Sequence, residues 1–213
     1  MNNALISYLK TQIIPLYDNF DRAHQADHVY KVIEESLDIA KDYDVDLNMV
    51  YTIASYHDIG MQFGRSDHHL TGGRFLFEDQ ALTSFFNEEE RIIMKEAIED
   101  HRASREDEPR SIYGKIIAEA DRDIDYETII LRTVQFGFKH YPDLTEDEHQ
   151  KRAIKHIEEK YGPEGYLKLW LKTKKNTLGL QKIHELLKEQ TELKNMIETF
   201  YENEKKYQKT TKK

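Results

Sequence analysis

Residues 50–60 read VYTIASYHDIG, an apolar helical stripe that ends in a histidine and an aspartate. Apolar residues precede His57 at the spacing of one buried helix face, at Ala54, Ile53 and Val50. A histidine on such a face, followed at once by Asp58, is costly to bury unless something compensates both groups. A bound cation would do so. We therefore refer to this pair as the His-Asp doublet and predict a metal site there.

Composition limits the protein class and the kind of metal site. The chain has 213 residues, of which 38% are hydrophobic and 33% charged, and this predicts one globular domain, residues 1–213. It contains no cysteine, so disulfides and thiolate metal sites are excluded. Histidine and carboxylate donors favour a divalent ion such as Mn, Mg, Fe, Co, Ni or Zn.

Charge and hydropathy also limit partners and location. The net charge of −9 argues against general nucleic-acid binding. We see no secretory signal after the first methionine and no apolar run of membrane-spanning length. We therefore expect a cytoplasmic protein without a membrane partner.

The spacing of apolar residues is helical almost throughout, and only four prolines and nine glycines interrupt it. We expect about eight to ten helices and no strand, which makes the fold all-α. Pro15 should bend or end a first helix that begins near Leu5. Asn87 and Glu90 resemble a capping box, as do Thr145 and Glu148. The predicted helices cover about residues 5–13, 29–40, 50–58, 68–80, 87–101, 111–122, 127–139, 145–160 and 167–170, followed by a long C-terminal helix.

The C-terminal region contains a short seam with alternating steps of three and four residues. Two interpretations remain open: a long helix that packs on its own domain, or a homodimer contact through this helix. The seam consists of Ile183, Leu186, Gln190, Leu193, Ile197 and Phe200.

Three further polar residues lie at or beside the core-facing side of a predicted helix, near its end: His28, His101 and Asp121. Each one alone is more often a satisfied core residue or a helix cap. Together with the His-Asp doublet, in a chain without cysteine, they indicate one shared site for a cation. His68 and His69 are a candidate fifth contribution, and periodicity does not choose between them.

This pattern resembles the H…HD…D signature of the HD-domain superfamily of metal-dependent phosphohydrolases. The matching residues are His28, His57, Asp58 and Asp121, and their flanking residues agree with the signature. The resemblance implies an HD-domain helical bundle with its core at about residues 20–140, followed by a C-terminal helical extension at about 141–213.

The resemblance also implies a ligand set for one or two metal ions. One ion would be held by the four signature residues. In two-metal members a second ion is held by residues that match His68 and His101 here, with Asp58 as the bridge. This register favours His68 over His69 as a ligand.

The activity implied is hydrolysis of a phosphate ester or anhydride by metal-activated water, with a nucleotide or another small phosphorylated metabolite as substrate. Asp58 would be a ligand and orient the water, and His69 or His24 would protonate the leaving oxygen. Basic side chains near the ligands are candidates to bind the phosphates: Arg65, Arg102, Lys115 and Arg122.

Two other functions are compatible with the same residues. A few members of the superfamily are di-iron oxygenases, and the six-ligand set suits them as well. The third hypothesis is a non-catalytic, metal-containing regulatory module.

Overall fold

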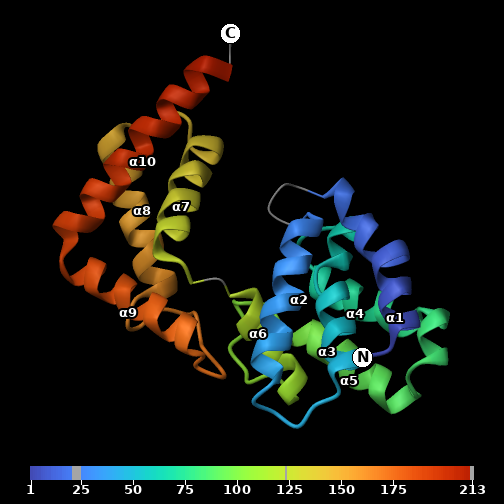
Figure 1. The fold of residues 1–213 in the computed structure, drawn as a ribbon. Helices are drawn as coiled ribbons and strands as arrows, with labels where there is room; N and C mark the ends of the chain where they lie inside the picture. The colour runs from blue at the N-terminus through green and yellow to red at the C-terminus, as the bar shows by residue number, and fades with distance from the viewer. Residues whose placement is uncertain (21–24, 123, 212–213) are drawn as a thin grey trace. The chain divides into compact units, whose positions relative to one another are not determined.

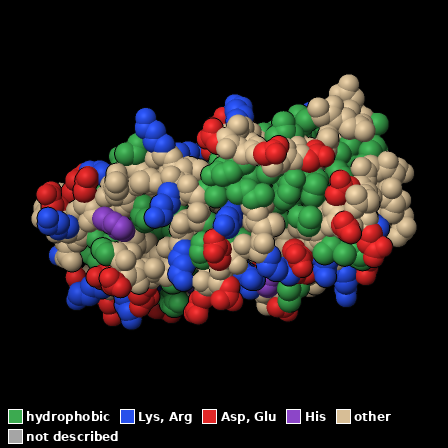
Figure 2. Space-filling view, turned by 90° about the horizontal axis from the view of Figure 1, so that it is seen from below, with side chains coloured by type: hydrophobic (Ala, Val, Ile, Leu, Met, Phe, Trp, Pro, Cys, Tyr) green, Lys and Arg blue, Asp and Glu red, His purple; other side chains and the backbone are tan. Residues whose placement is uncertain are grey.

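The computed structural model describes residues 1–20, 25–122 and 124–211, and this part of the chain is helical without any strand (Figure 1). The all-α prediction is confirmed. None of the described helices is long and apolar enough to cross a membrane. Figure 2 shows hydrophobic side chains gathered in one area of a face on which acidic and basic side chains are otherwise interspersed.

The chain divides into two compact units. The first comprises Met1–Arg122 with Trp170–Thr173, and the second comprises Asp123–Leu169 with Lys174–Lys213. The division after Arg122 lies earlier than the predicted start of the extension near residue 141. The first unit contains α1 (Asn3–Tyr8), η1 (Leu9–Ile13), η2 (Ile14–Asn19), α2 (Ala26–Ala40), α3 (Leu47–Tyr56), η4 (Ile59–Phe63), α4 (His68–Glu78), η5 (Gln80–Ser84), α5 (Glu88–Asp100) and α6 (Ile112–Asp121). The second contains α7 (Tyr126–His140), α8 (Glu146–Tyr161), α9 (Lys174–Lys188) and α10 (Gln190–Thr211).

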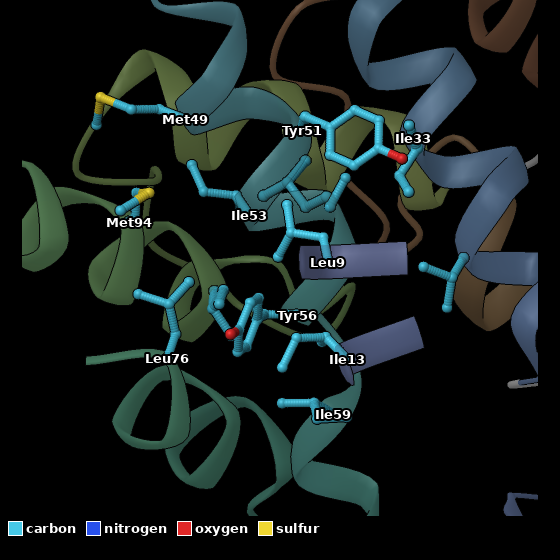
Figure 3. Close-up of a cluster of buried hydrophobic side chains, with 14 of the residues drawn as sticks. Leu9, Ile13, Ile33, Met49, Tyr51, Ile53, Tyr56, Ile59, Leu76 and Met94 are labelled. Carbon is cyan, nitrogen blue, oxygen red and sulfur yellow. The ribbon is translucent and has the colours of Figure 1, made fainter. Parts of the chain in front are cut away.

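Helix α3 is the core of the first unit. Asp46 caps its start by accepting a hydrogen bond from the Asn48 backbone N–H at 2.7 Å. Every residue from Met49 to Tyr56 is buried, and α2, α5 and α6 pack around the helix. Each large apolar side chain buried in this way contributes about 1.5–3 kcal/mol. The cluster includes Leu9, Ile53, Tyr56, Leu76 and Met94 (Figure 3).

The two predicted capping boxes are confirmed. The Asn87 side chain accepts from the Glu90 backbone N–H at 3.0 Å, and the Glu90 carboxylate accepts from the Asn87 N–H at 2.8 Å. Thr145 and Glu148 form the same reciprocal pair at the start of α8. Both pairs satisfy backbone donors that a helix start leaves without a partner.

The first predicted helix is divided into three pieces. Helix α1 passes into the π-helical turn η1 and then into the 3-10 helix η2, which contains Pro15. Proline has no backbone N–H to donate to a carbonyl one turn earlier. The preceding Ile14 N–H bonds to the carbonyl of Leu9, five residues back, so the hydrogen-bond register has already changed.

The prediction of a helix over residues 167–170 is wrong, since this segment is not helical. Trp170 and Leu171 instead donate their backbone N–H groups to the Glu119 carboxylate, at 3.1 and 3.4 Å. The Thr173 hydroxyl donates to the same carboxylate at 3.3 Å. Glu119 is 1% exposed, and a buried carboxylate is costly without hydrogen-bond donors. Because the backbone N–H groups of Trp170 and Leu171 bond to this carboxylate, they do not form helical hydrogen bonds.

The C-terminal seam is formed by two helices rather than one, because α9 ends at Lys188 and α10 begins at Gln190. Helix α10 packs on α7, α8 and α9 of its own unit. Phe200 is only partly buried, and Tyr201 is buried instead. The homodimer contact stays a prediction. The seam residues buried in this unit are Ile183, Leu186, Leu193 and Ile197.

Gly60 permits the close approach of η4 to α4 beside the His-Asp doublet. A Cβ atom there would overlap the carbonyl oxygen of His68 and lie 2.6 Å from the backbone nitrogen of Gly72. We expect Gly60→Ala to lower the free energy of unfolding by about 1–3 kcal/mol, because backbone atoms must move apart. Urea unfolding measures this. The exposed control Ser66→Ala should change it by less than about 0.5 kcal/mol, and equal stability of the two variants would contradict the close approach.

Candidate metal centre

Helix ends of the first unit bring the predicted ligands together. His57 follows α3 as its C-terminal cap, and His101 caps α5 in the same way. His68 is the first residue of α4, while Asp121 is the last residue of α6. His28 lies in the first turn of α2. Backbone groups at helix ends lack partners within the helix, so these positions can hold polar side chains without disturbing the apolar faces.

One group of possible metal ligands lies around the Oδ2 atom of Asp58. The Nε2 atoms of His28 and His57 are 3.2 Å apart. Asp58 Oδ2 lies 3.3 Å from His57 Nε2 and 3.7 Å from His28 Nε2. Asp121 Oδ1 lies 3.2 Å from His28 Nε2 and 3.9 Å from His57 Nε2. Four side chains from three segments, the start of α2, the end of α3 and the end of α6, therefore present donor atoms to one small volume.

The second oxygen of Asp58 faces a different pair of histidines. Asp58 Oδ1 lies 3.3 Å from His68 Nε2 and 3.5 Å from His101 Nε2. The carboxylate is 5% exposed and stands between the two groups of donors. Donor atoms of Asp58 with His28 and His57, and of Asp58 with His68 and His101, lie close enough to hold an ion in each group.

Three of the histidine rings are held by backbone carbonyls three residues earlier. The Nδ1 atoms of His57, His68 and His101 lie 2.8, 2.8 and 2.6 Å from these oxygens. A carbonyl oxygen can only accept, so Nδ1 carries the hydrogen and a neutral ring directs its Nε2 lone pair into the site. This is the arrangement that orients histidine as a metal ligand.

The carboxylates remain ionised in this environment. Burial raises the pKa of Asp58, but the nearby His57 and His101 outweigh it and hold the pKa well below its usual range. Burial alone would lower the pKa of His57, yet Asp58 and Asp121 raise it to about 9. Without a cation the site thus compensates its carboxylates with protonated histidine, and a metal ion would replace the proton. The four imidazole and two carboxylate side chains fit a borderline divalent ion.

Two buried residues that hold the segments beside His57 and His101 in place were not predicted from the sequence. Tyr17 is completely buried, and its hydroxyl donates to the carbonyl of Ser55 at 3.1 Å, two residues before the doublet. Asp100 is also buried, and its carboxylate accepts from Arg110 at 2.9 Å and pairs with Arg105 at 3.1 Å. These contacts tie the segment after His101 to α5. The sequence carried a signal only for Asp100, as an acid before a loop that contains three arginines.

The remaining predicted site residues lie in different environments. The Arg102 side chain donates to the Ser66 carbonyl at 2.9 Å, and its charge adds to burial in lowering the pKa of His69 to about 4. Lys115 pairs with Glu108 at 2.6 Å. Arg122 is 6% exposed, and its guanidinium has no hydrogen-bond partner in the described structure.

Arg65 and His24 complete the set of predicted site residues. Arg65 lies in the loop before α4, and its carbonyl is the oxygen that holds His68 Nδ1. His24 lies outside the described residues.

Residues 26–124 match the family model of the HD domain. This part of the chain is an HD domain. The HD domain contains all six predicted ligands and ends close to the boundary of the first unit.

A solved structure is similar to the chain over most of its length. It is a predicted HD superfamily hydrolase from an uncultured Thermotogales bacterium, with 19% identity and a TM-score of 0.47. The similarity covers 87% of this chain and 91% of that one. None of the curated proteins compared with the chain matches it.

Because Asp58 lies between two histidine pairs, we expect variants of the ligands to retain different amounts of metal. Asp58→Ala should retain less Mn²⁺ than His28→Ala or His68→Ala, because it removes an oxygen from both groups of donors. Metal content after gel filtration, measured by mass spectrometry, checks this order. The exposed His156→Ala should retain the wild-type amount. Equal retention by Asp58→Ala and His68→Ala would contradict the shared position.

Proposed function

We propose that this HD-domain protein is a metal-dependent phosphohydrolase that cleaves a phosphate ester or anhydride of a nucleotide or another small phosphorylated metabolite. The observation that carries the proposal is the Asp58 carboxylate, which directs one oxygen to each of two histidine pairs. A shared carboxylate between two groups of nitrogen donors suits a pair of divalent ions.

The ligands would divide between the two ions. His28, His57 and Asp121 would hold one ion with Asp58 Oδ2, while His68 and His101 would hold the other with Asp58 Oδ1. When bound, a divalent ion supplies a Lewis acid for a phosphoryl oxygen and lowers the pKa of water. Asp58 keeps its charge when buried, so it can orient a water molecule by accepting a hydrogen bond.

Arg102 is the best-supported phosphate-binding residue. Its charge acts on both His68 and His69, so it lies beside one group of donors. The hydrogen bond to Ser66 fixes one nitrogen and leaves other guanidinium donors for a phosphate. Lys115 would first have to leave Glu108. Arg122 would gain by binding an anion, because a buried guanidinium without hydrogen bonds is costly.

His69 would take part in proton transfer as a neutral group. Burial and Arg102 lower its pKa to about 4, so the ring is uncharged near pH 7. A neutral imidazole can accept a proton at one nitrogen and donate one from the other. The alternative proton donor proposed here is His24.

A phosphate-release assay tests the proposal. Purified protein is incubated with nucleotides and phosphoesters and with Mn, Mg, Co, Ni or Fe ions. We expect metal-dependent release that falls by roughly 100-fold or more in Asp58→Ala, because the shared ligand is lost. The exposed α2 variant Asp38→Ala should keep wild-type activity.

Two outcomes would favour other functions. Iron-dependent turnover that consumes O₂ without phosphate release would replace the phosphohydrolase by a di-iron oxygenase. Metal binding with no turnover of any substrate class would support a regulatory module.

A further inference from the structure

The HD-domain unit has an open cavity of about 430 Å³ between its N-terminal segment and α4. This volume is in the range of small-molecule sites. None of the residues around it is a predicted ligand, catalytic residue or phosphate-binding residue. The lining residues are Tyr8, Gln12, Ile13, Leu16, Phe75, Glu78 and Asp79.

The apolar lining of the cavity comes from the consecutive elements η1 and η2 and from α4. Ile13 belongs to the π-helical turn η1, and Leu16 belongs to the 3-10 helix that follows. Leu16 lines the open cavity, and 36% of its surface is exposed. Phe75 forms the facing part on α4, and its ring centroid is 6.2 Å from that of Tyr56 in the core. Isolated π-helical turns occur often at functional sites.

The polar end of the cavity carries negative charge. Asp79 Oδ2 accepts hydrogen bonds from the hydroxyls of Tyr8 at 2.6 Å and Tyr56 at 2.5 Å, and Oδ1 accepts from the Ala81 N–H at 2.9 Å. Three donors hold this carboxylate in place. The Glu78 carboxylate is 68% exposed beside it, with Arg74 Nε 4.0 Å away.

The lining therefore combines acids and aromatic rings. Among the described residues that line the cavity there are two carboxylates and no Lys or Arg. Carboxylates attract a cation and repel an anion, and the aromatic ring of Tyr8, whose hydroxyl bonds to Asp79, can add to the attraction of an ammonium group. This chemistry is opposite to that of the phosphate site proposed above.

We propose that this cavity binds a small organic ammonium ion. Its apolar part would lie against Ile13, Leu16 and Phe75, and its charge would lie at the end formed by Glu78 and Asp79. The site is separate from the proposed phosphohydrolase centre and does not depend on its activity.

Three probes with the same phenethyl body and different charges test the proposal on the full chain by isothermal titration. They are phenethylammonium, phenethyl alcohol and hydrocinnamate. We expect saturable binding of the ammonium, at least about threefold weaker binding of the alcohol, and weaker binding still of the carboxylate. Equal affinities for the three probes, or no saturable binding of the ammonium, would overturn the proposal.

Two variants locate the binding. Glu78→Gln should weaken the ammonium about threefold to fivefold and leave the alcohol unchanged, since one exposed carboxylate contributes this much. Glu89→Gln makes the same change on α5, at an exposed position outside the cavity, and should have no effect. Leu16→Trp should abolish binding of ammonium and alcohol by filling the cavity. Unchanged ammonium binding in either Glu78→Gln or Leu16→Trp would overturn the proposed position.

Discussion

The buried Asp58 carboxylate is the constraint around which the HD-domain unit is arranged. A charge at 5% exposure is costly unless it is compensated from several directions. Nitrogen atoms of four histidines provide this compensation, two at each carboxylate oxygen. The same compensation keeps the carboxylate ionised when no cation is bound, and a bound cation would replace the proton that histidine holds.

The helix ends meet this constraint because they offer backbone carbonyls without helical partners. His57 and His101 donate through Nδ1 to the carbonyls of Ala54 and Ile98, the second of which also accepts from the His101 backbone N–H, and both rings are thereby held with Nε2 directed inward. Gly60 then lets the chain after the doublet pass close to α4, which carries His68. Helix termination, ring orientation and the position of the second histidine pair are therefore parts of one arrangement.

Sequence patterns predicted most of the helices because apolar spacing and caps are local properties. Asn87 and Glu90 form the predicted capping box, since both partners lie within one turn. The segment before α9 was predicted wrongly, because the acceptor of its backbone donors is Glu119, about fifty residues away. Pro15 indicated a break, but the π-helical turn before it depends on packing and could not be predicted from residue types.

The sequence alone determined the all-α class, the main helices and the kinds of donor atoms available for a metal. Spacing along single helices could do this because it is fixed by the 3.6-residue helical period. Only the tertiary structure decided which oxygen of Asp58 faces which histidines and where Tyr17 lies. It also decided that Tyr8 and Tyr56 meet at Asp79 beside a cavity. These distances depend on how separate helices pack, which no local pattern records.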